Sequence, residues 1–63
     1  MIGQVTCMIA PSMEIFDKAE LENPSQLENM LRYLYSITDE LPFGVVIDDG
    51  EGNVTNRFGN PKN

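Results

Sequence analysis

A single amphipathic helix between Asn23 and Pro42 is the feature that most restricts how this chain can fold. Asn23 is a strong N-cap residue, Pro24 suits the first helical position, and Gln26 stands where a capping box has its polar partner. The apolar residues that follow repeat with helical spacing, within about 60° of one line along the helix: Leu27, Met30, Leu31, Leu34, Ile37 and Leu41. Pro42 disfavours helical geometry at the residue before it, so we expect the helix to end near Glu40.

Residues 4–9 precede this helix as a predicted strand. Their side chains alternate with a period of two, which places Val5, Cys7 and Ile9 on one face and Thr6 and Met8 on the other. The stretch is rich in β-branched residues, as half-buried strands are. We therefore expect one face of this strand to contribute to the core.

Residues 13–22 allow two interpretations. In the first they form a strand, in which Phe16 points away from the core and Asp17 interrupts the apolar face. That face carries four residues: Met13, Ile15, Ala19 and Leu21. Residues 10–12 have the composition of a turn, and strands joined by short turns are commonly neighbours, so the strand is favoured.

The second interpretation of residues 13–22 is a helix. Ser12 would cap it, and Glu14 and Lys18 would form a favourable pair one turn apart. The apolar stripe of such a helix is thin, which makes this interpretation the weaker of the two.

Residues 43–58 have the pattern of a β-hairpin. Apolar side chains alternate in residues 43–48, the sequence Asp-Gly-Glu-Gly supplies a turn, and a second strand runs over residues 53–58. A two-residue turn at Gly50-Glu51 gives a register with an aliphatic pair and an aromatic pair on one face. The two pairs are Ile47 with Val54 and Phe43 with Phe58.

The predicted element order is β-β-α-β-β. It defines a single small α+β domain over residues 1–63, with one amphipathic helix packed on one face of a small antiparallel sheet. The other face should be thinly covered, with Met8 and Val46 on it, and residues 59–63 should form a frayed tail.

The residue types that most enzymes need are missing. The chain has no histidine and one cysteine, so it lacks the commonest general base and the usual partner of a nucleophilic Cys or Ser. The same counts exclude an intrachain disulfide and a Cys/His zinc site. The acidic segment 48–53 does not have the spacing of a calcium loop, and we interpret it as a hairpin turn. We predict no enzymatic activity, no cofactor and no metal.

The acidic residues all lie in the first 51 residues of the chain. The net charge is −6, and residues 1–51 hold all ten acidic residues with only Lys18 and Arg32. The negative electrostatic field of this charge repels the phosphate backbone of nucleic acids, so we expect no direct nucleic-acid binding. It attracts basic protein surfaces, although mild acidity also simply keeps a small protein soluble.

Aromatic and acidic side chains form the predicted partner-binding surface. Tyrosine is enriched at protein interfaces, and two tyrosines flank the apolar stripe of the helix about 100° to either side. In an alternative interpretation these rings seal the seam between helix and sheet. The predicted partner-binding residues are Tyr33, Tyr35, Asp39, Glu40, Asp48, Asp49 and Glu51.

In size, charge and predicted topology the chain resembles the small acidic proteins with which phages and mobile elements block host enzymes. The resemblance implies an inhibitor or regulator that binds a larger protein, with a nucleic-acid-handling enzyme as one target class. The acidic residues are spread over every predicted element, which neither supports nor excludes mimicry of nucleic acid.

The alternative function is a self-associating structural or regulatory module. A domain of 63 residues buries a small core and has no disulfide or metal to reinforce it, so we expect a homodimer or higher oligomer. An unpaired edge strand or the bare sheet face would supply the contact. The sequence shows no secretory signal and no membrane span, and a lone thiol suits the reducing cytoplasm, where we expect the protein to act.

Overall fold

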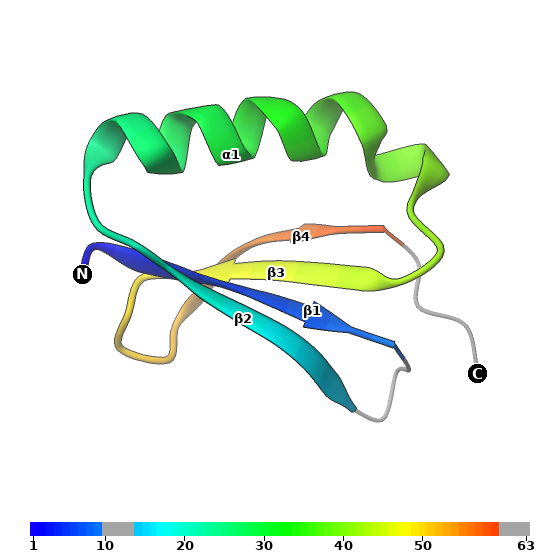
Figure 1. The fold of residues 1–63 in the computed structure, drawn as a ribbon, viewed down its shortest axis with the longest axis horizontal. Helices are drawn as coiled ribbons and strands as arrows, with labels where there is room; N and C mark the ends of the chain where they lie inside the picture. Colours follow the sequence, from blue (N-terminus) through cyan, green and yellow to red (C-terminus); the bar gives the residue numbers. More distant parts are fainter. Residues whose placement is uncertain (10–13, 60–63) are drawn as a thin grey trace.

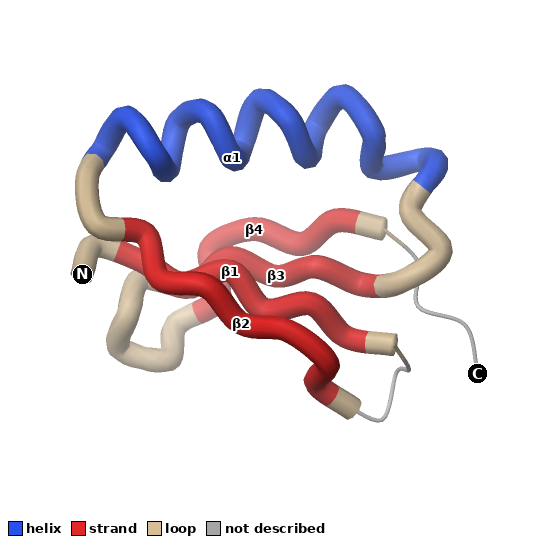
Figure 2. Tube along the Cα trace, in the orientation of Figure 1, coloured by secondary structure: helices blue, strands red, loops and turns tan. Residues whose placement is uncertain are grey.

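The computed structural model describes residues 1–9 and 14–59, which form an α+β fold in the order β-β-α-β-β (Figure 1). The four strands make one antiparallel sheet with the order β2-β1-β3-β4. The elements are β1 (Gly3–Met8), β2 (Ile15–Leu21), α1 (Pro24–Ile37), the 3-10 turn η1 (Thr38–Glu40), β3 (Gly44–Asp48) and β4 (Val54–Phe58). Helix α1 covers one face of the sheet (Figure 2).

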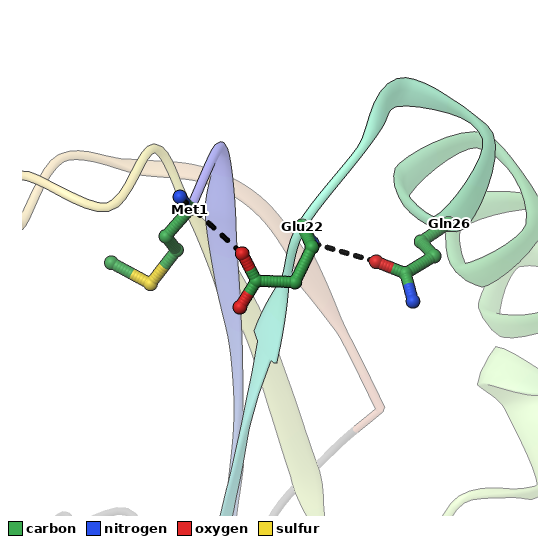
Figure 3. A network of polar contacts seen from close by, with 3 residues as sticks. All are labelled: Met1, Glu22 and Gln26. Carbon is green, nitrogen blue, oxygen red and sulfur yellow. Dashed lines mark hydrogen bonds and ion pairs between the residues drawn. The ribbon is translucent and has the colours of Figure 1, made fainter.

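The start of α1 follows the predicted capping pattern. The Asn23 side chain accepts a hydrogen bond from the backbone N–H of Gln26 at 3.0 Å, and Pro24 is the first helical residue. The Gln26 side chain accepts from the backbone N–H of Glu22 at 2.6 Å, one residue earlier than in a standard capping box. Glu22 also pairs with the Met1 ammonium at 3.5 Å, which ties the start of the helix to the start of the chain (Figure 3).

The end of α1 also matches the sequence. The α-helix stops at Ile37 and continues as η1 to Glu40, where the prediction placed its end. The backbone N–H of Leu41 closes this last turn on the carbonyl of Thr38 at 3.4 Å, and Leu41 itself has extended geometry before Pro42. The chain therefore leaves the helix and enters β3 at the far end of the sheet from Asn23 (Figure 1).

Strand β1 lies in the interior of the sheet and alternates as predicted, except that Ile9 follows the end of the strand and is exposed. Val5 belongs to the core under α1 and Cys7 packs against it, whereas Thr6 and Met8 lie on the opposite face. In the described part of the chain no element covers that opposite face (Figure 2). Even so, Thr6, Met8 and Val46 are buried there.

Residues 15–21 form a strand, which confirms the favoured interpretation, but its alternation is broken. Asp17 lies opposite Cys7 while Ile15 lies opposite Met8, so Phe16 is an extra residue in a β-bulge. Ile15 therefore leaves the face that it was predicted to share with Ala19 and Leu21. The prediction that Phe16 points away from the core is also wrong, because its ring contacts Phe43 edge-on, with centroids 5.1 Å apart.

The predicted register of the β3–β4 hairpin is wrong, by two residues along Val45–Ile47 and by one residue beyond the bulge, at Asp48. Phe58 lies opposite Val45 rather than Phe43, and Val54 lies opposite Asp48 rather than Ile47. The connection is longer than a two-residue turn and includes a bulge after Ile47. The shift of two residues leaves Phe58 on the core face, but the shift of one residue at the bulge moves Val54 to the other face, so the predicted Ile47–Val54 pair does not form.

The core lies between α1 and the sheet. Six buried residues form it: Val5, Leu21, Leu34, Val45, Ile47 and Phe58. The predicted helical stripe faces this cluster, with Leu34 buried and Leu27, Met30, Leu31 and Leu41 packed around it.

Gly59 is not part of a frayed tail. Its backbone N–H donates to the Thr38 hydroxyl at 2.8 Å, and it is half-buried with a positive φ of 73°. The remainder of the predicted tail, residues 60–63, lies outside the described residues, as do the predicted turn at 10–12 and Met13.

Candidate interaction site

The two tyrosines occupy opposite sides of the helix, as their spacing predicted. The Tyr35 ring stacks edge-on against Phe58 of β4 with centroids 4.9 Å apart, and its hydroxyl accepts a hydrogen bond from the Asn56 amide at 3.3 Å. Tyr33 faces β2 instead. Both rings are largely exposed, at 59% for Tyr33 and 63% for Tyr35. Tyr35 therefore seals one seam of the fold, and Tyr33 flanks an open one.

The acidic residues of the predicted surface lie at two opposite ends of the molecule. Asp39 and Glu40 belong to η1, at the end of the helix. Asp48, Asp49 and Glu51 lie at the β3–β4 turn, near the helix start (Figure 1). The longest dimension of the fold is 33 Å. The structure therefore does not bring the seven predicted residues together into one surface.

Two of the hairpin carboxylates hold the turn itself. Asp48 accepts a hydrogen bond from the Gly50 N–H at 2.7 Å. Asp49 accepts from the side chain of Asn53 at 3.0 Å and from the N–H of Glu51 at 2.8 Å. The hydrogen bonds to Asp49 lower its pKa, because they favour the ionised carboxylate, and the bond from the Asn53 side chain has the largest effect. The interpretation of the acidic segment as a hairpin turn is confirmed.

An open groove runs between the outer strand β2 and helix α1. It consists of two adjoining hollows of about 380 and 230 Å³. Ala19, Met30 and Tyr33 line both of them. The floor of the smaller hollow includes Val5 and Cys7 of β1. The groove is mainly apolar, with polar groups at its margin.

The path of the helix explains the groove. Helix α1 starts beside the end of β2, where Leu21 is buried, and its last turn reaches β4 through the contact of Tyr35 with Phe58. It thus crosses the sheet diagonally and leaves the first part of β2 uncovered (Figure 1). The small side chain of Ala19 does not fill the space beneath Met30 and Tyr33.

Strand β2 is also an open edge. It is the outer strand of the sheet, and six of its seven residues are exposed. Within residues 1–9 and 14–59, no segment pairs with its outer side, so its backbone N–H and C=O groups there face solvent. The other outer strand, β4, is closed on its helix side by the Tyr35–Phe58 contact. An open edge beside an apolar groove is thus a property of β2.

The Cys7 thiol is a poor nucleophile in this setting. Burial, and then the negative charge of Asp17, raise its pKa, so the thiolate is disfavoured. Among the described residues, no three His, Cys, Asp or Glu side chains are grouped so that they could hold a metal ion. No helix in the described ranges is both long and apolar enough to span a bilayer.

Sequence reasoning identified Tyr33 but missed the rest of the groove. Met30 was assigned to the helix core and Ala19 to the core face of a strand, and neither was recognised as part of an opening. The available signal was the presence of Asp17 and Ala19 at successive positions of the face predicted to meet the core, which gives that face little apolar side-chain volume to pack against a helix.

Comparison of the chain with protein-family models, with curated proteins and with solved structures found no match.

Proposed function

We propose that this chain is a small, non-catalytic interaction module that regulates or inhibits a larger protein by strand addition at β2. The observation that carries the proposal is the open β2 edge beside the α1–β2 groove. In strand addition, main-chain hydrogen bonds supply affinity, and pockets for alternate side chains supply specificity. The edge and the groove offer these two components side by side.

The charge of the groove margin indicates the chemistry of the partner. Asp17 is exposed and lines the smaller hollow on the helix side of the sheet, whereas Lys18 and Glu20 belong to the opposite face. A complementary segment is extended, places an apolar side chain over Ala19, and carries Lys or Arg beside Asp17. Basic surfaces of this kind occur on nucleic-acid-handling proteins. We place the interaction in the cytoplasm, where Cys7 stays a thiol.

Self-association through the same edge is the second candidate function. The charges on β2 favour it, because Lys18 and Glu20 stand on either side of Ala19 on one face of the strand. An antiparallel copy of this strand has the complementary order of charges.

The two tyrosines provide a matched test of the partner-binding proposal. The partner is first recovered by affinity capture from the native host and purified. We expect Tyr33→Ala to weaken its binding by about 30-fold, as loss of an aromatic anchor at an interface does. Tyr35→Ala removes a ring of similar exposure from the opposite side of the helix and should leave the affinity close to wild type. Circular dichroism checks that both variants are folded.

A third variant tests the surface expected from the sequence. It neutralises the hairpin tip through Asp48→Asn, Asp49→Asn and Glu51→Gln. If this variant lost the partner while Tyr33→Ala kept it, the binding site would lie at the hairpin tip and the groove proposal would be wrong.

A further inference from the structure

The outer edge of β2 carries an ordered set of charges. Lys18 lies opposite Thr6 and Glu20 lies opposite Gln4 in the neighbouring strand, so both charged side chains are on the face away from α1. Thr6 and Gln4 are uncharged. Among the described residues, the ion pairs of the fold involve neither Lys18 nor Glu20. These two charges are therefore free to meet charges on a strand added at the edge.

Symmetry restricts how a second copy can pair with this edge. Two antiparallel copies of one strand in a continuous sheet are related by a two-fold axis, which passes beside one residue that faces itself. Centring on Asp17, Lys18 or Glu20 would place like charges opposite each other. Centring on Leu21 would bring Glu20 opposite Glu22 of the second copy. Each of these registers is disfavoured by direct cross-strand repulsion.

Centring on Ala19 gives the opposite result. Lys18 then faces Glu20 of the second copy, and Glu20 faces Lys18 of the second copy, so two attractive cross-strand pairs form at once. Asp17 faces Leu21 of the second copy, which is uncharged. Within the regular part of β2, residues 17–21, this is the register that matches opposite charges without a like-charged pair.

We propose that the β2 edge pairs antiparallel with a second copy of this chain, centred on Ala19, to give a continuous eight-stranded sheet. Both helices lie on the same face of that sheet, because the axis is perpendicular to it. The two α1–β2 grooves adjoin over the small Ala19 side chains, and Met30 and Tyr33 of each copy border the joint. Since a larger protein would need the same edge, dimerisation and the proposed partner binding exclude each other.

Charge reversal on the edge tests this register. In Lys18→Glu, two attractive pairs become Glu–Glu pairs, and in Glu20→Lys they become Lys–Lys pairs. We expect each variant to dimerise about tenfold more weakly than wild type in sedimentation velocity, because two cross-strand contacts change sign. An equal mixture of the two variants pairs Glu with Lys at both positions, so it should form heterodimers of about wild-type strength. The double variant K18E/E20K should likewise recover self-association.

Arg57→Glu is the matched control. It changes the net charge by the same amount and sign as Lys18→Glu, on the same face of the sheet but on the opposite outer strand, β4, so dimerisation should be unchanged. An equal loss in Arg57→Glu would contradict the edge contact, because net charge alone would then explain the effect. Failure of the mixture to recover would contradict the Ala19 register. Circular dichroism checks that every variant is folded.

The proposed dimer uses the same β2 edge as the proposed partner binding, but it is argued from the order of charges along β2 rather than from the groove. A wild-type protein that stays monomeric up to hundreds of micromolar overturns the dimer proposal. If that monomer still lost a larger partner on Tyr33→Ala, the proposed function would stand while the dimer fell. If the dimer formed as described and Tyr33→Ala had no effect on the larger partner, partner binding at the groove would be wrong.

Discussion

Replacing Leu34 by alanine should lower the free energy of unfolding by about 2–5 kcal/mol, which is the usual cost of removing a buried leucine side chain and leaving a cavity. Leu34 is the buried residue of α1, with 4% of its surface exposed, and it packs in the core cluster beneath the helix. Stability is measured by urea denaturation at one fixed protein concentration, because self-association would make it concentration-dependent.

Tyr33→Ala is the control for this prediction. It shortens the neighbouring residue of the same helix, but the ring is 59% exposed, so the loss of stability should be clearly smaller. Equal losses in the two variants would mean that α1 packs on the sheet through a different face.

Replacing Gly59 by alanine should be comparably destabilising, for two separate reasons. Gly59 has a φ of 73°, a left-handed conformation that costs an L-residue roughly 1–2 kcal/mol. A side chain there would also overlap the carbonyl oxygen of Phe43 and lie 3.1 Å from the Leu41 Cβ. Relieving that overlap requires a backbone shift, which adds roughly 1–3 kcal/mol. Thermal unfolding measures the total effect.

Gly52→Ala separates the two reasons. Gly52 also has a positive φ, of 94°, but nothing lies within 4 Å of the added carbon. It should show the backbone cost alone, so Gly59→Ala should melt at a clearly lower temperature. If the two variants melted together, the packing of Gly59 between Leu41 and Phe43 would contribute nothing.

The parts of the fold that local interactions determine were predictable from the sequence. The Asn23 cap, the end of the helix near Glu40 and the apolar stripe through Leu34 each depend on residues within a few positions of one another. The opposite placement of Tyr33 and Tyr35 follows from helix geometry in the same way. The choice of a strand for residues 13–22 rested on how often strands joined by short turns are neighbours and on the thin apolar stripe of the alternative helix, and the strand at Ile15–Leu21 confirms it.

Features that depend on pairing between strands were not predictable. The bulge at Phe16 and the shifted hairpin register arise from how two strands meet, and the sequence of one strand does not fix either of them. The groove is still harder to predict from the sequence, because it depends on the diagonal path of α1 over the sheet. Ala19 becomes informative only once that path shows what lies above it.

Nuclear magnetic resonance during dilution tests most directly the central claim that β2 is the interaction edge. Backbone amide spectra of the wild-type protein are recorded from millimolar to low micromolar concentration. We expect concentration-dependent shifts at Asp17–Leu21 and at Met30 and Tyr33, with Asp39 and the hairpin tip at Asp48–Glu51 unchanged. Shifts confined to the hairpin tip or to β4 would contradict the claim. It would also be contradicted if the spectra did not change with concentration and the β2 amides did not shift when a partner was added.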